Sequence, residues 1–118
     1  MSDAILLFAL LVAGHYIADF AMQNQFVADM KSKVHTDPHG WHALIAHSVH
    51  HATLTGLTVF FVGQAPLSAL TIGICTGAAH AVIDYKKAVD HSFGITVDQA
   101  LHLGWLLYVV AVITHFGL

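Results

Sequence analysis

The stretch that decides the fold is residues 67–85, which reads LSALTIGICTGAAHAVIDY. It is long and apolar enough to cross the hydrocarbon core of a bilayer, which takes about 20 residues of helix. It nevertheless contains two ionisable side chains, His80 and Asp84, four residues apart. Because positions i and i+4 lie on one face of a helix, these side chains offer donor atoms to a common point. The pattern predicts a membrane-spanning helix with a polar pair on one face.

Three further apolar stretches repeat this arrangement. We expect helices over residues 4–28, 41–62, 67–85 and 97–117, which together form one transmembrane domain covering residues 1–118. Each carries one pair at i,i+4 spacing, and the pairs are His15 and Asp19, His47 and His51, His80 and Asp84, and Asp98 and His102. The predicted fold is therefore all-α, a polytopic membrane protein built as a bundle of four transmembrane helices.

The composition agrees with this fold and excludes other classes. The chain is 57% hydrophobic and 9% charged, with a mean hydropathy of +0.70, which is far from the balance of a soluble domain. No stretch rich in Lys or Arg is present, so we expect no nucleic-acid partner. The expected partner is the lipid bilayer, and a homodimer is compatible with the sequence.

The four lysines predict the orientation in the membrane. Lys31 and Lys33 lie between the first two spans, and Lys86 and Lys87 lie between the last two. The positive-inside rule places both loops in the cytoplasm and both termini outside. These lysines form a collar that could attract an anionic lipid headgroup.

This topology places the pairs on the second, third and fourth spans in the cytoplasmic half of the membrane. His15 and Asp19 join them if the first helix continues past Phe26, at about 1.5 Å of rise per residue. Gly73, Gly77 and Ala81 form a row of small residues that favours close helix approach beside the site. Thr96 and Gln99 have the spacing of a capping box at the start of the fourth helix.

The eight paired residues predict a metal site. Neutral imidazole and carboxylate are ligands of divalent transition metals; we expect Zn²⁺, with Fe or Mn as alternatives. Eight donors suffice for two ions, or for one ion with Asp side chains that orient the ligating histidines. Gln23 and Gln99 are candidate hydrogen-bond partners of the ligands. His50 is three residues after His47 and competes with His51 for the same role, and the sequence leaves this choice open.

Such a site predicts a membrane-embedded hydrolase that acts on a lipid or an amphiphilic (phospho)ester from the cytoplasmic side. The ion would activate water, and Asp98 or His51 would serve as general base. The alternatives are a transporter of divalent metal or protons, a haem carrier, and a structural bundle in which His and Asp only join the helices. The three aspartates argue against haem.

Several motifs, taken in their order along the chain, resemble those of a small integral-membrane family of unknown function. This family is numbered 3307 and is found in bacteria and phages. The motifs are HYIADFAMQ at residues 15–23, Lys31, HSVHH at 47–51, HAVIDYK at 80–86 and DQALH at 98–102. The resemblance covers nearly the whole chain and implies a polytopic protein of the bacterial inner membrane, without a settled activity. The helices are also loosely similar to those of membrane proteins described as metal-dependent hydrolases.

Overall fold

A computed structural model describes residues 2–117, which form five α-helices and one π-helical turn without any strand. The elements are α1 (Ser2–Tyr16), η1 (Ile17–Ala21), α2 (Gln25–Met30), α3 (His39–Phe61), α4 (Pro66–Ala88) and α5 (Ile95–Phe116). The all-α prediction is confirmed.

The expected helix over residues 4–28 is divided into three pieces. α1 passes into the π turn η1, in which the Met22 amide donates to the Ile17 carbonyl at 2.9 Å, and the helix then ends. α2 starts anew because the Asn24 side chain caps it and accepts from the Val27 amide at 2.9 Å. A single helix past Phe26 was therefore the wrong expectation.

Local chemistry also sets the ends of the long helices. Pro66 occupies the first turn of α4, where its missing N–H costs nothing. α5 ends at Gly117, whose φ of 62° is the left-handed conformation that glycine adopts readily. The predicted capping box at Thr96 is wrong, because Gly94 is the N-cap of α5 and no side chain caps it.

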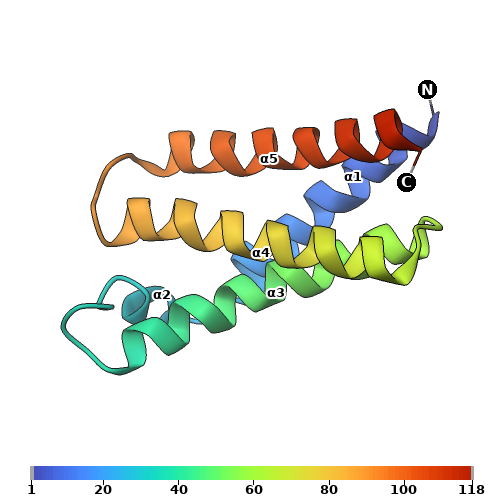
Figure 1. Cartoon of the computed structure of the whole chain (residues 1–118). Helices are drawn as coiled ribbons and strands as arrows, with labels where there is room; N and C mark the ends of the chain where they lie inside the picture. The colour runs from blue at the N-terminus through green and yellow to red at the C-terminus, as the bar shows by residue number, and fades with distance from the viewer. Residues whose placement is uncertain (1, 118) are drawn as a thin grey trace.

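The four long helices form a closed ring (Figure 1). α1 packs on α3 and α5, and α4 packs on the same two helices from the other side. Both termini and the α3–α4 turn lie at one end of the bundle, while α2 and the α4–α5 loop lie at the other (Figure 1). The four lysines therefore gather at a single end, which we call the lysine end.

The bundle is 45 Å long, more than the roughly 30 Å of a hydrocarbon core. Within residues 2–117, three helical stretches have the length and hydropathy of a membrane span: Asp3–Ala21, Pro66–Ala88 and Ile95–Phe116. α3 is as long as α4, at 23 residues, but it contains five histidines and is not among these stretches. The fourth span stays a prediction.

The close approach of α3 and α4 follows from glycine. A Cβ on Gly73 would lie 2.6 Å from the Ala52 carbonyl oxygen, and one on Gly77 would lie 2.8 Å from the Ala52 Cβ. Neither position has room for a side chain, which confirms the predicted role of this row of small residues. The two helices can therefore bring their histidines into ring contact.

Candidate metal site

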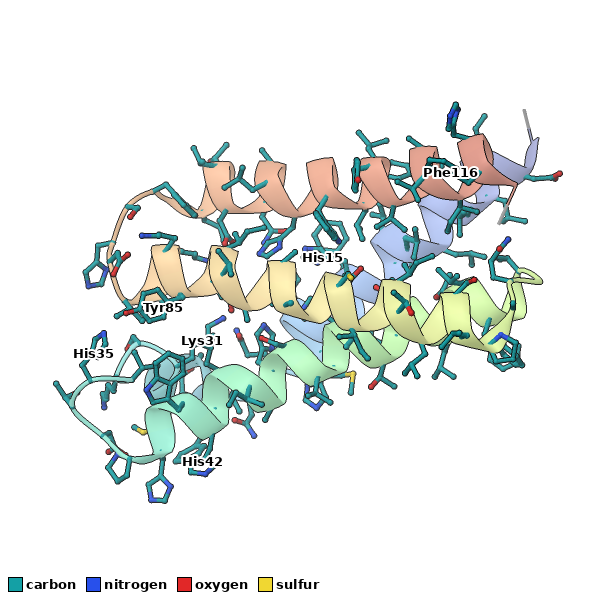
Figure 2. All side chains as sticks on the ribbon, viewed as in Figure 1. His15, Lys31, His35, His42, Tyr85 and Phe116 are labelled. Atoms are coloured by element: carbon teal, nitrogen blue, oxygen red, sulfur yellow. The ribbon has the colours of Figure 1, made fainter. Side chains whose placement is uncertain are left out.

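All eight predicted ligands meet inside the bundle, toward the lysine end. Seven of them are buried, and the side chain of Asp19 is 12% exposed. Figure 2 shows His15 about midway along the bundle, between α4 and α5, and Lys31 closer to the lysine end. The donor atoms form three overlapping groups, each compact enough to surround one ion.

The first group consists of His15, Asp19, His51 and His80, whose donor atoms all lie within 4.8 Å of one another. Asp19 is at its centre. Its Oδ1 lies 3.1 Å from the His51 Nε2 and 3.7 Å from the His80 Nε2, and its Oδ2 lies 3.4 Å from the His15 Nε2. Three imidazoles and one carboxylate match the ligand set of zinc.

The second and third groups share members with their neighbours. The second comprises His47, His80 and Asp84, and the third comprises Asp84, Asp98 and His102. The His102 Nε2 lies 3.4 Å from Asp98 Oδ1 and 3.8 Å from Asp84 Oδ1. The three groups therefore form a continuous cluster, linked through His80 and Asp84.

Several of these donor atoms have no hydrogen-bond partner although they are buried. They include the Nε2 atoms of His47, His80 and His102 and the Oδ1 of Asp98. Unsatisfied buried polar atoms are uncommon because each costs about 1–3 kcal/mol. Ligands of a tetrahedral zinc ion lie about 3.3 Å apart, which is close to the separations found here. The donors are thus spaced closely enough to hold an ion, and many of them also lie in His/Asp pairs with each other, such as His51 with Asp19 at 3.1 Å.

The π turn positions the ligands of the first helix. His15 lies in the last turn of α1 and Asp19 lies inside η1. A π turn holds one more residue than an α turn and is often found at functional sites. It carries Asp19 into contact distance of His47 and His51 on α3, at 3.2 Å and 3.1 Å from their Nε2 atoms.

Histidine rings from three helices stack on one another. The rings of His51 and His80 are stacked with centroids 3.4 Å apart, and the rings of His80 and His102 with centroids 4.2 Å apart. His51 is 3% exposed and faces Asp19, whereas His50 is only half-buried and belongs to none of the three groups. Of the two neighbouring histidines, His51 therefore faces the cluster and His50 does not belong to it.

Gln99 contacts the predicted ligands as expected, whereas Gln23 contacts Lys31, which is not one of them. The Gln99 amide donates to Asp19 Oδ2 at 3.0 Å and to Asp98 Oδ2 at 3.1 Å, while its oxygen lies 3.2 Å from the His15 Nε2. The Gln23 oxygen accepts from the Lys31 ammonium at 2.6 Å. Gln99 thus holds two carboxylates and one imidazole in place.

Two lysines belong to the cluster, which the sequence analysis missed. Lys31 is 8% exposed and donates to Asp84 Oδ2 at 2.6 Å, and Lys87 donates to Asp98 Oδ2 at 2.7 Å. Lys86 pairs with Asp90 at the surface. A loop lysine ordinarily points to water, and the available signals were the place of Lys31 among the family motifs and its proximity to Gln23 in sequence. The attraction of a lipid headgroup by the lysine collar stays a prediction, and Lys33 and Lys86 are the exposed members of that collar.

The cluster is closed toward the terminal end of the bundle. A cavity of about 10 Å³ lies on that side of the histidines, near the lower limit for one water molecule. Thr55, Thr76 and Trp105 border it, and the Trp105 indole donates to the Thr76 hydroxyl at 3.1 Å. The most exposed side chains of the cluster are Lys87, at 27%, at the lysine end, and Asp19, at 12%.

Comparison with known proteins identifies a family and no activity. The family model described as "Protein of unknown function (DUF3307)" matches residues 6–118, so the chain belongs to this family. No curated protein and no solved structure matches the chain. Its function must therefore be argued from the cluster itself.

Proposed function

We propose that this member of the DUF3307 family is a membrane-embedded metalloprotein that holds a divalent transition metal, with Zn²⁺ preferred. The ion would serve the hydrolysis of an ester in a lipid or another amphiphile at the lysine end. Each part of this proposal has its own support and its own test.

Membrane embedding is supported by the distribution of polarity. Large apolar side chains cover much of the outer surface, including Phe61 at 78% exposure and Leu67 at 75%. Meanwhile the buried residues include five histidines, two aspartates and a lysine. Water does not favour such a surface, but lipid does. The positive-inside rule would then place the lysine end in the cytoplasm.

Metal binding is carried by one observation: buried Nε2 atoms without hydrogen-bond partners converge on carboxylate oxygens at the spacing of metal ligands. The first group is the best site because it offers four donors, with Asp19 supplying negative charge at its centre. Within residues 2–117, Asp19 is also the one carboxylate of the cluster that no lysine neutralises. A cation is therefore most favourable beside Asp19.

Hydrolysis is supported by the carboxylate of Asp98, which belongs to the cluster but not to the first group. A divalent ion would act as a Lewis acid that activates water and polarises an ester oxygen. Asp98 keeps one oxygen, Oδ1, without a hydrogen-bond partner and can accept a proton there. His51 lies within the first group as a ligand, so we assign the role of general base to Asp98.

Transport is less well supported. Beyond the histidines, the described bundle interior is filled by apolar side chains, among them Leu11, Val59 and Ile113. An ion that crosses the membrane needs polar groups or water along its whole path. The cluster therefore has access from one side, as a binding or catalytic site requires.

The first test is the metal content of protein purified in a mild detergent. We expect about one transition-metal ion per chain, and less than about one tenth of that in His80→Gln, because the substitution removes one of four ligands. His115→Gln is the matched control, since His115 is exposed near the end of α5. A metal-free wild-type protein would overturn the proposal.

The second test separates catalysis from binding. The loaded protein is assayed with para-nitrophenyl phosphate and with para-nitrophenyl acyl esters in mixed micelles. We expect Asp98→Asn to keep its metal while losing hydrolysis by about 100-fold or more, the size of a general-base contribution. Equal rates in wild type and Asp98→Asn would remove hydrolysis and leave a metal-binding protein.

A further inference from the structure

The third group of the cluster differs from the first in its surroundings. Asp84, Asp98 and His102 are each at most 3% exposed. Each carboxylate gives its Oδ2 to a lysine: Asp84 to Lys31 at 2.6 Å and Asp98 to Lys87 at 2.7 Å. Figure 2 shows Lys31 reaching in between α3 and α4. Two ammonium groups therefore stand beside this group.

The remaining oxygens of the third group point to its histidine. The Oδ1 atoms of Asp98 and Asp84 lie 3.4 Å and 3.8 Å from the His102 Nε2. Both Asp98 Oδ1 and the His102 Nε2 are buried without a hydrogen-bond partner. These atoms have the chemistry and spacing of a second cation site.

Charge decides whether a second ion binds there. With neutral histidines, three carboxylates and two ammonium groups give the described cluster one negative charge, and one divalent ion changes this to one positive charge. A second divalent ion would add two more positive charges in a setting with little water, where charge is expensive. Without the two lysines, two divalent ions would give the same single positive charge.

We propose that Lys31 and Lys87 stand in for a second metal ion, so that the natural protein binds one ion in the first group and keeps the third group as a latent metal site. Removal of both ammonium groups opens that site to a second ion. This inference rests on the proposed metal binding and refines it by assigning its stoichiometry.

The test is elemental analysis after loading with Zn²⁺ and removal of free ion. We expect about one equivalent in the wild type and about two in Lys31→Met/Lys87→Met, because methionine keeps the length of lysine without its charge. Lys33→Met/Lys86→Met is the matched control: it removes the same charge from the same end, and both side chains are exposed. It should stay at about one equivalent.

A second variant keeps the proposal testable if the double methionine variant does not fold. Asp98→Asn removes a carboxylate of the third group and no member of the first, and its partner Lys87 is 27% exposed and can reach water. We expect Asp98→Asn to keep one equivalent. Two equivalents in the wild type with one in Asp98→Asn would mean that the third group already holds a metal, which overturns the inference.

The remaining outcomes are also distinct. A folded Lys31→Met/Lys87→Met protein with one equivalent would overturn the inference and leave the proposed metal binding intact. A wild type that binds no metal would overturn both. A lysine control that gains a second equivalent would also contradict the inference, because loss of charge anywhere at this end would then suffice.

Discussion

The two halves of the bundle interior are built on the same four helices and have opposite chemistry. Toward the termini the core is apolar and consists of Leu7, Leu11, Val59, Ala69, Leu106, Val109, Val110 and Ile113. Toward the lysine end it consists of the His and Asp cluster. The same four helices therefore carry both a packed apolar core and a candidate metal site.

The change occurs along continuous inward-facing rows. Three of these rows, with members four residues apart, are Leu7, Leu11, His15 and Asp19; His47, His51, Thr55 and Val59; and Asp98, His102, Leu106 and Val110. Residues at this spacing stay on one face of a helix. The period determines which residues face inward, whereas residue type alone determines which half becomes polar.

The largest expected effect is in the polar half. Asp84→Ala should lower the free energy of unfolding by about 3–5 kcal/mol, because it leaves the Lys31 charge buried without a partner. The measurement is SDS-induced unfolding in mixed micelles with a metal chelator present. Asp90→Ala breaks the exposed pair with Lys86 and should cost about 1 kcal/mol or less.

A double substitution sharpens this prediction. Asp84→Ala/Lys31→Met removes both charges of the pair and should recover much of the stability. A double variant as unstable as Asp84→Ala alone would show that the carboxylate matters through its histidine neighbours rather than through Lys31.

In the apolar half, Leu11→Ala should cost about 2–4 kcal/mol, because Leu11 is 2% exposed and its removal leaves a cavity. Metal content should stay at the wild-type value. Leu67→Ala, at a position 75% exposed, is the matched control and should change little. Loss of metal in Leu11→Ala would mean that the two halves are not independent.

At the α3–α4 contact, which both halves share, Gly73→Ala should cost about 1–3 kcal/mol. Its Cβ would lie 2.6 Å from the Ala52 carbonyl oxygen, so the helices must move apart. Gly104→Ala meets nothing within 4 Å and should be neutral or stabilising by up to about 1 kcal/mol. Equal effects of the two substitutions in the same unfolding assay would contradict the close packing.

The smallest effect is expected at the boundary between the halves. Trp105→Phe removes the hydrogen bond to Thr76 and should cost about 0.6 kcal/mol, the average for such bonds in membranes. The exposed Tyr108→Phe is the control and should be neutral. A loss several times larger in the unfolding assay would show that Trp105 also seals the cluster.

The positions of the long helices, and the side chains that each of them turns toward the bundle interior, could be predicted because both depend on periodicity. The i,i+4 spacing of His80 and Asp84, or of Asp98 and His102, is enough to place both members on one face. The convergence of the four pairs then follows from a bundle with short connections. Gln99 was predictable as a neighbour of Asp98, although its bonds to Asp19 come from the packing of α5 on α1.

The break in the first helix and the roles of Lys31 and Lys87 could not be predicted. The π turn and the Asn24 cap reflect small differences in backbone energy that hydrophobic pattern does not report. Lys31 is buried only because α2 folds back on α3, a tertiary contact that lies outside any helical period. Histidines lower the hydropathy of α3, and two of them, His47 and His51, belong to the cluster, so α3 lacks the hydropathy of the three candidate spans.

The π turn makes the length of one short segment as important as its composition. Deleting a single residue from Ile17–Ala21 would restore an α turn and rotate everything that follows by about 100°. α1 would keep its place, but α2 and Lys31 would be turned away from Asp84. A one-residue change in spacing is thus enough to shift Asp19 and to disconnect the internal lysine from the cluster.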